Sequence, residues 1–297
     1  MAATQVPAGE AVAPLAVIDM EKMLQGDPET AKDLLRAAES PGFFHVDLRG
    51  PSFRDMLDDI EAIYRVTHDY FSQPLEVKQA HFRSGVDRGC VLDVPSRYPS
   101  HISLHLIRVG SKDVHGAYMN YRYKPGKTGE SFEIAMSEIS DTSLAFPDLM
   151  GSYDALMKRC ALKCDEITKI LLNSLLRSLG KPELESIMTA NPGDSGLKLL
   201  DVPTSERRQD APDTTHTDSG ILTLLWCPQL YNQIQDPATK EWQWVEQKEG
   251  LAIANVADTL QAHTDGKLHS CVHRIWQPGD GAGERLFLSY YLRPATV

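Results

Sequence analysis

The chain has 297 residues, of which 42% are hydrophobic, so it can bury a sizeable core and does not have the composition of a disordered protein. Its 30 basic and 41 acidic residues give a formal net charge of -11, which argues against a surface that collects phosphates or anionic lipids. We therefore expect neither a nucleic-acid partner nor a membrane partner.

The five cysteines are odd in number, and only Cys160 and Cys164 lie close together in the sequence. Neither a disulfide framework nor a cysteine-rich zinc site is therefore predicted, and buried thiols in a reducing compartment are the simplest interpretation. The N-terminus lacks the basic segment and apolar stretch of a signal peptide, and no apolar run is long enough for a transmembrane helix. These features predict a cytoplasmic protein.

The N-terminal half alternates short strands with helices. We expect a strand over residues 15–19, a helix over 28–39, a strand over 42–47 and a helix over 52–71 that ends before Pro74. Residues 83–129 are rich in Gly, Pro, Ser and Tyr and are expected to form a loop, of the kind that often covers a binding site. Helical periodicity then predicts a long helix over 148–180.

The C-terminal part has the period-two pattern of short strands separated by turns. These strands are expected at residues 197–202, 220–227, 232–235, 243–246, 251–256, 269–276 and 285–292. Their number and spacing are typical of a barrel or a double-sheet jelly roll. Because no repeat or linker is visible, residues 1–297 are interpreted as a single domain, with a helix-rich support region of about 1–190 and a β core of about 195–297.

A cluster of metal-ligand residue types lies in this β region. His216 and Asp218 stand two positions apart before a strand, so an extended backbone points both side chains to one face. His273, on a later strand, can supply a third ligand. Two histidines and one carboxylate on one face of iron leave positions open for oxygen and substrate. The sequence therefore predicts a mononuclear non-heme iron(II) site of an oxygenase.

Other histidines in the chain are weaker candidates. His45 and Asp47 lie in an N-terminal strand, which is expected to be far from the β core, and are interpreted as a structural pair. His263 and Asp265 fall in a polar turn after a short helix, which suits a protein surface. His269 shares a strand face with His273, so a role for His269 in supporting the metal ligands is left open. Two further histidines have helical spacing and are assigned to local packing: His101 and His105.

An ordered series of motifs resembles the isopenicillin N synthase-like branch of the 2-oxoglutarate and iron(II)-dependent dioxygenases. The resemblance covers nearly the whole chain, from the opening strand to the arginine near the C-terminus. The matching segments are Leu15–Asp19, Gly42–Phe44, Tyr70–Lys78, His216–Gly220, Gln233–Gln235, Trp242–Val245, Asn255–Leu260, His273–Arg274 and Arg285.

The resemblance implies a mainly β fold with helices, built on a double-stranded β-helix, and an enzyme that couples oxygen activation to oxidative decarboxylation of 2-oxoglutarate. It implies iron(II), 2-oxoglutarate and O2 as cofactor and co-substrates, with ascorbate as a further candidate. Arg285 falls where the co-substrate arginine belongs. The substrate is expected to be a small natural product or an amino-acid derivative, as in secondary metabolism, and to be hydroxylated, desaturated or cyclised. The oligomeric state is left open.

The chain departs from the family pattern around the expected 2-oxoglutarate pocket. Phe287 stands where a serine usually follows the arginine, and Leu200 and Val202 replace a usual Asn and Tyr. By strand parity, Lys198 shares a face with Leu200 and Val202, so Lys198 is predicted as a replacement contact to the co-substrate, with a solvated strand lysine as the alternative interpretation. Ser289 lies roughly 7 Å beyond Phe287 along its strand, which is too far for the same carboxylate.

Several residues are candidates for a substrate pocket. They come from the loop over 83–129 and from the strand that carries Arg285, and they are Arg108, Tyr118, Tyr121, Tyr123, Phe287 and Ser289. For each aromatic residue, a place in the protein core is the competing interpretation.

Two alternative functions compete with the dioxygenase. The altered co-substrate positions favour an iron(II) oxidase of the same fold that works without 2-oxoglutarate, and turnover without that co-substrate would reveal it. The other alternative is a non-catalytic ligand-binding module, for which an incomplete set of metal ligands would be expected. His216, Asp218 and His273 are all present, which argues against such a module.

Overall fold

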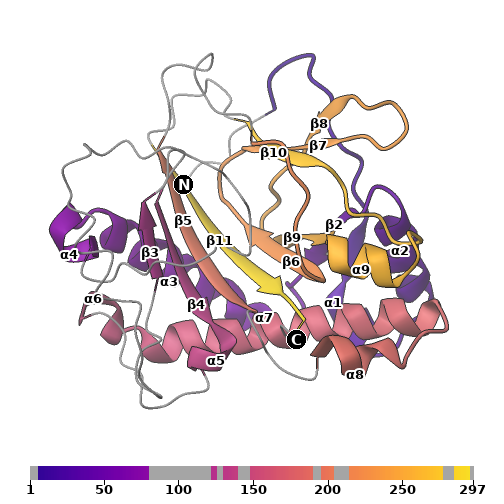
Figure 1. Ribbon diagram of the computed structural model, residues 1–297, viewed down its shortest axis with the longest axis horizontal. Coiled ribbons are helices and arrows are strands. Elements are labelled where there is room, and N and C mark those ends of the chain that lie inside the picture. The colour runs from indigo at the N-terminus through magenta and orange to yellow at the C-terminus, as the bar shows by residue number, and fades with distance from the viewer. Residues whose placement is uncertain are drawn as a thin grey trace.

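The computed structural model describes residues 6–79, 122–125, 130–139, 148–189, 195–203, 214–276 and 284–294 (Figure 1). Two sheets and a set of helices make up this part of the chain. The helices are α1 (Met20–Leu24), α2 (Pro28–Glu39), α3 (Arg54–Phe71), α4 (Leu75–Gln79), α5 (Met136–Ile139), α6 (Asp148–Gly151), α7 (Asp154–Ser178), α8 (Leu184–Thr189) and α9 (Asp258–His263).

The larger sheet has eight strands in the order β1-β2-β9-β6-β11-β5-β4-β3. Only the β1–β2 pair is parallel, and the other neighbours are antiparallel. The strands are β1 (Val17–Asp19), β2 (Phe43–Asp47), β3 (Arg122–Pro125), β4 (Glu130–Ala135), β5 (Gly196–Pro203), β6 (Leu222–Trp226), β9 (Leu251–Val256) and β11 (Glu284–Leu292).

The smaller sheet has three antiparallel strands in the order β10-β7-β8. They are β7 (Asn232–Gln235), β8 (Trp242–Trp244) and β10 (His273–Ile275). An isolated bridge joins His216 to His273 in antiparallel fashion, with both backbone N–H···O=C distances at 2.9 Å. This bridge fixes the segment before β6 against the smaller sheet.

The two faces of the larger sheet carry different kinds of residues. On β11, Leu286, Leu288 and Tyr290 join the main hydrophobic cluster, to which α1, α2, α3 and α7 also contribute. Figure 1 shows the long helix α7 running across this side of the sheet. Because successive strand residues point to opposite faces, Arg285 and Phe287 point to the other side. One face therefore carries the core, and the other is available for chemistry.

Local signals explain where the N-terminal elements begin and end. Asp27 caps α2 because its side chain accepts a hydrogen bond from the backbone N–H of Thr30 at 2.8 Å, and Pro28 occupies the first turn. After α2 the chain turns at Gly42, whose φ of +85° lies in the region that glycine tolerates. This turn sends β2 into the larger sheet beside β9.

The structure corrects several predicted elements. The strand that carries His45 and Asp47 was expected far from the β core, but β2 pairs with β9 inside the larger sheet. The loop predicted over 83–129 contains β3 at its C-terminal end, and β4 was not predicted at all. β4 pairs with β5, and β3 pairs with β4. Such pairing between distant segments is not revealed by a local sequence pattern. The helix expected over 148–180 is split into α6 and α7 around residues 152–153.

Several other predicted helices and strands agree closely with the structure. The helix over 28–39 and the strands over 232–235 and 251–256 have the observed bounds, and the other described C-terminal strands overlap their predicted ranges. Cys160, Cys164, Cys227 and Cys271 are free and buried, as expected for structural thiols. Among the described residues, no helix has the length and apolar character needed to span a membrane.

Candidate metal centre

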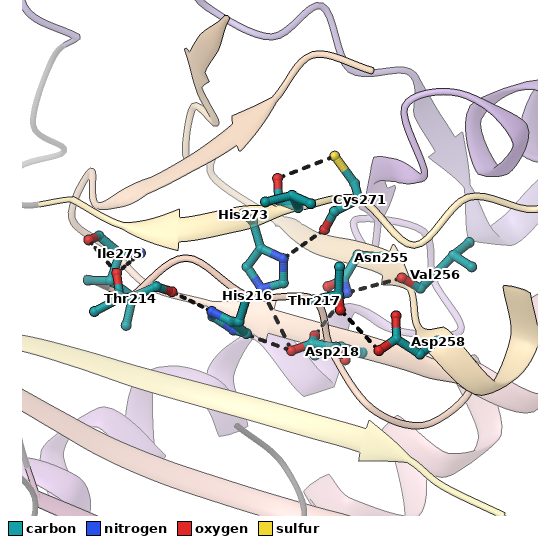
Figure 2. A network of polar contacts seen from close by, with 12 residues as sticks. Thr214, His216, Thr217, Asp218, Asn255, Val256, Asp258, Cys271, His273 and Ile275 are labelled. Atoms are coloured by element: carbon teal, nitrogen blue, oxygen red, sulfur yellow. Dashed lines mark hydrogen bonds and ion pairs between the residues drawn. The ribbon is translucent and has the colours of Figure 1, made fainter. Parts of the chain in front are cut away.

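His216, Asp218 and His273 come together on the side of the larger sheet that faces the smaller sheet (Figure 2). One ligand atom from each residue lies within 4.8 Å of the other two. Asp218 Oδ1 is 3.6 Å from the Nε2 atom of each histidine. The bridge between the two histidine backbones holds their ring centroids 4.2 Å apart.

Backbone carbonyls orient both imidazoles. His216 Nδ1 lies 2.5 Å from the carbonyl oxygen of Thr214, and His273 Nδ1 lies 3.0 Å from that of Cys271. A carbonyl oxygen only accepts, so each Nδ1 must carry the proton and donate it. The lone pair is then on Nε2, the atom that points toward Asp218 in both rings (Figure 2).

The two oxygens of Asp218 have different surroundings. Oδ2 accepts hydrogen bonds from the hydroxyl of Thr223 at 2.7 Å and from the amide of Asn255 at 2.9 Å. Oδ1 faces the two histidines instead. Thr223 belongs to β6 and Asn255 to β9, and the two residues are paired across these strands. The sheet therefore fixes the carboxylate so that one oxygen is turned toward the histidines.

Electrostatics favour the metal-binding forms of Asp218 and His273. Burial would raise the pKa of Asp218, but the neighbouring His273 and His216 and the hydrogen bond from Asn255 hold that pKa well below the usual range. Burial lowers the pKa of His273, although Asp218 opposes this effect. An ionised carboxylate beside neutral imidazoles is the state that accepts a divalent cation. The donor set of two nitrogens and one oxygen suits iron(II), with coordination positions left for other ligands.

The competing His-x-Asp pairs do not form metal sites with the described residues. Nε2 of His45 contacts the carbonyl oxygen of Glu246 at 2.9 Å, and Asp47 forms an ion pair with Arg49. His263 and Asp265 are exposed, and Asp265 pairs with Lys181 at 2.6 Å. The structural interpretation of both pairs is therefore supported.

His269 stands apart from the three clustered residues. Its backbone N–H donates to the carbonyl oxygen of Ala38 at 2.9 Å, and its own carbonyl faces Gly42. It ties the segment before β10 to the end of α2, so the contacts of its backbone are structural. His101 and His105 lie outside the described residues.

Comparisons with known proteins agree with this geometry. No family model matches the chain. The chain is 29% identical over 286 residues to a 2-oxoglutarate-dependent dioxygenase of Gibberella zeae, covering 94% of this chain and 79% of that protein. It is 26% identical over 290 residues to the 2-oxoglutarate-dependent dioxygenase gloE of Glarea lozoyensis, with the same coverages of 94% and 79%.

A solved structure shares the fold. A full-length Neurospora crassa protein, in complex with alpha-KG and 5-formyluracil, superimposes with a TM-score of 0.72 at 20% identity, covering 97% of this chain and 86% of that chain. Two curated dioxygenases thus match over nearly the full length of a chain that also carries the His-Asp-His cluster. The chain is therefore similar over nearly its full length to 2-oxoglutarate-dependent dioxygenases.

The arginine singled out in the sequence, Arg285, is fully buried on β11. Arg285 Nε donates to the carbonyl oxygen of Leu230 at 3.2 Å. Beside it lies a buried apolar cluster of Val202, Cys227, Tyr231 and Phe287, in which the Phe287 ring packs edge-on against Tyr231 at 4.0 Å. The substitutions noted in the sequence therefore give this end of the sheet an apolar wall.

Lys198 and Ser289 lie further along the same face of the dioxygenase. They are paired with each other across β5 and β11, whereas Arg285 pairs with Val202. Lys198 Nζ lies 3.3 Å from Glu133 Oε1 on β4. This register places Lys198 four residues from the partner of Arg285, which argues against the predicted contact of both cations with one co-substrate carboxylate.

Some predicted substrate residues cannot be located. Arg108, Tyr118 and Tyr121 lie outside the described residues, and Tyr123 is placed only through its backbone pairing with Phe132. Conversely, the sequence interpretation gave no site role to Thr223, Asn255 or Glu133. A signal for Thr223 existed, since it lies on a strand that begins shortly after Asp218. Glu133 was missed because its strand was not predicted.

Proposed function

We propose that this chain is an iron(II)- and 2-oxoglutarate-dependent dioxygenase that oxidises a small molecule. The proposal rests mainly on the grouping of His216, Asp218 and His273, whose ligand atoms lie within 4.8 Å of one another. In both histidines, the lone pair of Nε2 points toward Asp218. The named dioxygenases among its relatives support the same activity.

The three residues have distinct roles in this proposal. Nε2 of His216, Nε2 of His273 and Oδ1 of Asp218 would hold iron(II). When bound, the iron supplies the activation of O2 that is coupled to oxidation of 2-oxoglutarate. Thr223 and Asn255 keep Asp218 turned toward the metal through its other oxygen.

Arg285 is the proposed partner of the co-substrate. Its side chain is fully buried, and a guanidinium held away from water is stabilised by a carboxylate partner. The apolar side chains of Phe287, Tyr231 and Val202 beside it exclude water, which strengthens such an ion pair. Two-point binding by the metal and Arg285 would fix the orientation of 2-oxoglutarate.

The proposed architecture is a double-stranded β-helix within one domain. The bridge between His216 and His273 joins the larger and smaller sheets at the metal residues, as expected if the two sheets form a jelly roll around the site. β1, β2, β3 and β4 come from the N-terminal region, so the helix-rich part also contributes strands to the larger sheet.

The proposed substrate is a small organic molecule of secondary metabolism. A structural neighbour binds thymine, and the dioxygenases of Gibberella zeae and Glarea lozoyensis are fungal. Hydroxylation, desaturation and oxidative cyclisation all begin with removal of a hydrogen from the substrate, so the metal residues serve each of them. The cytoplasmic location remains a prediction from the sequence.

Product analysis after exposure of the iron(II)-loaded protein to O2 tests this function. With 2-oxoglutarate present, the wild-type protein should release succinate, and Asp218→Ala should release less than about a hundredth as much, the scale on which loss of a metal ligand acts. Thr217→Val is the matched control, since Thr217 lies between the two ligands but donates to Asp258.

The apolar residues near Arg285 favour one alternative function, an oxidase. Leu200, Val202 and Phe287 are apolar, which favours an oxidase that draws all electrons from its own substrate. Oxygen consumption that needs substrate and is unchanged by 2-oxoglutarate would identify that oxidase. Failure of the protein to bind iron(II) under anaerobic conditions would instead favour a non-catalytic binding module.

A further inference from the structure

A charged pair lies on the larger sheet beside the metal centre. Glu133 of β4, Lys198 of β5 and Ser289 of β11 are paired in register across three neighbouring strands. We call these three residues the polar rung. Lys198 Nζ lies 3.3 Å from Glu133 Oε1, and the two side chains are only 9% and 12% exposed. The hydroxyl-bearing Ser289 is also buried.

The polar rung lies on the same face of the sheet as the metal residues. On β11, Ser289 stands two positions from Tyr291, which is paired with Thr223, and Thr223 donates its hydroxyl to Asp218. Residues two apart on a strand share a face, as do directly paired residues on neighbouring strands. The alternate residues of β5, Leu197 and Leu199, belong to the hydrophobic core on the opposite face.

The rung lies at a distance from the metal that a small molecule can span. Lys198 is two strands and two residues away from Thr223, which corresponds to about 12 Å between backbone positions at normal strand spacings. Its long side chain shortens that gap. Arg285 lies four residues from Ser289, toward the other end of β11, so the rung is separate from the proposed guanidinium anchor of 2-oxoglutarate.

A purely structural role explains this pair poorly. Removing two charges from water is costly, and apolar side chains at the same positions would stabilise the sheet about as well. Moreover, Glu133 Oε1 is buried and accepts no hydrogen bond from the described residues, despite its closeness to Lys198. A buried acceptor of this kind gains free energy when a ligand donates to it.

The charges of the rung indicate the class of ligand. Lys198 is a donor and Glu133 an acceptor, and together they carry no net charge, so a lone carboxylate or ammonium group would meet one like charge. A neutral group with an N–H or O–H beside a C=O satisfies both residues. Leu200, Phe287 and Leu225 lie nearby on the same face and would contact an apolar body.

We propose that Glu133, Lys198 and Ser289 form a substrate subsite that binds a neutral amide-like group of an otherwise apolar molecule. This proposal rests on the proposed function, because the subsite would hold one end of a substrate whose other end lies beside the iron. It gives Lys198 a role in substrate binding in place of the co-substrate contact predicted from the sequence.

Three probes of the same size and different charge test the subsite: benzamide, benzoate and benzylamine. Calorimetric titration of the anaerobic protein, loaded with iron(II) and 2-oxoglutarate, should show tightest binding of benzamide. Lys198→Met leaves Glu133 alone and should make benzylamine the preferred probe, whereas Glu133→Gln should make benzoate the preferred probe. Each preference should change by about tenfold, as expected for one hydrogen bond to a charged group.

Controls separate a subsite from a structural ion pair. Lys169→Met removes an ion pair with Asp165 on α7 and should keep the wild-type order of probes. Ser289→Ala, which leaves the pair intact, should weaken benzamide binding and also keep the order. The melting midpoint of each variant shows whether it is folded. If the two charge variants do not fold, the order of probe affinities in the wild type and in Ser289→Ala tests the subsite instead.

Two results would overturn the subsite: no probe bound by the wild type, or one order of affinity in the wild type and both charge variants. The visible absorption of the 2-oxoglutarate complex is read before any probe is added. Its absence in the wild type would contradict the proposed function, while the probe order can still be measured in the iron-loaded protein. The two failures are therefore distinguishable.

Discussion

At the scale of single residues, the metal centre depends on groups that do not touch the metal. Thr214 and Cys271 carbonyls set the protonated nitrogen of each histidine, and Thr223 and Asn255 occupy one oxygen of Asp218. Each ligand is thus held in one orientation before a metal binds. Such supporting contacts typically change metal affinity by factors of about 10 to 100.

Removing the support of Asp218 should weaken iron binding. We expect Thr223→Val and Asn255→Leu each to raise the Kd for iron(II) by about 10-fold or more, because Asp218 Oδ2 then keeps only one of its two donors. Anaerobic titration with iron(II) measures the effect. Thr217→Val is again the matched control, and an equal loss of affinity in this control would contradict the specific role of Thr223.

His45 should make the stability of the metal-free protein depend on pH. Burial lowers the pKa of His45 in the folded state, although the hydrogen bond to the Glu246 carbonyl opposes this. The unfolded chain therefore takes up a proton near the ordinary pKa of about 6.5, at a pH where folded His45 is still neutral. Its contribution to stability is complete above that pH and decreases as the pH falls below it.

Urea denaturation of the metal-free protein between pH 7.5 and 5.5 measures this contribution. We expect His45→Gln, which keeps an N–H donor without a titrating group, to lose less stability over that interval than the wild type. The same substitution at exposed His263 serves as the control. A wild-type slope that His45→Gln leaves unchanged would contradict the assignment.

At the scale of elements, the turn between α2 and β2 positions the N-terminal part of the larger sheet. Gly42 has a φ of +85°, and a Cβ atom at this position would lie 1.8 Å from the carbonyl oxygen of His269. The residue thus needs both an unusual backbone conformation and the absence of a side chain. This contact brings the end of α2 against the segment that leads to His273.

Replacing this glycine should destabilise the protein strongly. Gly42→Ala combines the strain of a positive φ with a backbone clash, so the loss in free energy of unfolding should exceed about 1 kcal/mol. Gly180→Ala is the control, because Gly180 has a φ of +69° but nothing within 4 Å of an added Cβ. Similar losses in the two variants, measured by urea denaturation, would show that the clash has no effect.

A comparison of predicted and observed elements shows which features of the fold a sequence pattern can predict. α2, β7 and β9 were predicted with their observed bounds because capping residues and local periodicity define them. The place of β2 in the larger sheet and the existence of β4 depend on pairing with β9 and β5, which are distant in sequence. His216, Asp218 and His273 were found because strand parity is a local property. The support that Thr223 and Asn255 give to Asp218 depends on their pairing across β6 and β9, and Glu133 lies on a strand set by pairing with β5. A single sequence does not reveal such pairings, although Thr223 does follow shortly after Asp218.

At the scale of the whole molecule, the larger sheet separates packing from chemistry. Its alternate residues face the helices α3 and α7 and form the main hydrophobic core. The other face carries Arg285, the polar rung and the two residues that hold Asp218, Thr223 and Asn255. Substitutions on the first face should therefore change stability, whereas those on the second should change binding.

Metal binding should stabilise the whole fold. A ligand that binds only the folded state at about 100 times its Kd adds about 2.7 kcal/mol to the free energy of unfolding. Anaerobic thermal unfolding should therefore show a higher melting midpoint with iron(II). Asp218→Ala should abolish the increase, and an unchanged increase in this variant would mean that iron binds at another place.

The proposed function requires one site that binds both iron(II) and 2-oxoglutarate, with Arg285 as the anchor of the co-substrate. Its most direct test is the visible absorption of the anaerobic iron(II) protein on titration with 2-oxoglutarate. We predict the weak metal-to-ligand band of a chelated 2-oxo acid, and an apparent Kd that Arg285→Gln raises by about tenfold or more. Arg274→Gln is the control, since Arg274 stacks on Trp242 and Trp276. Iron binding without any such band would show that this site does not chelate 2-oxoglutarate.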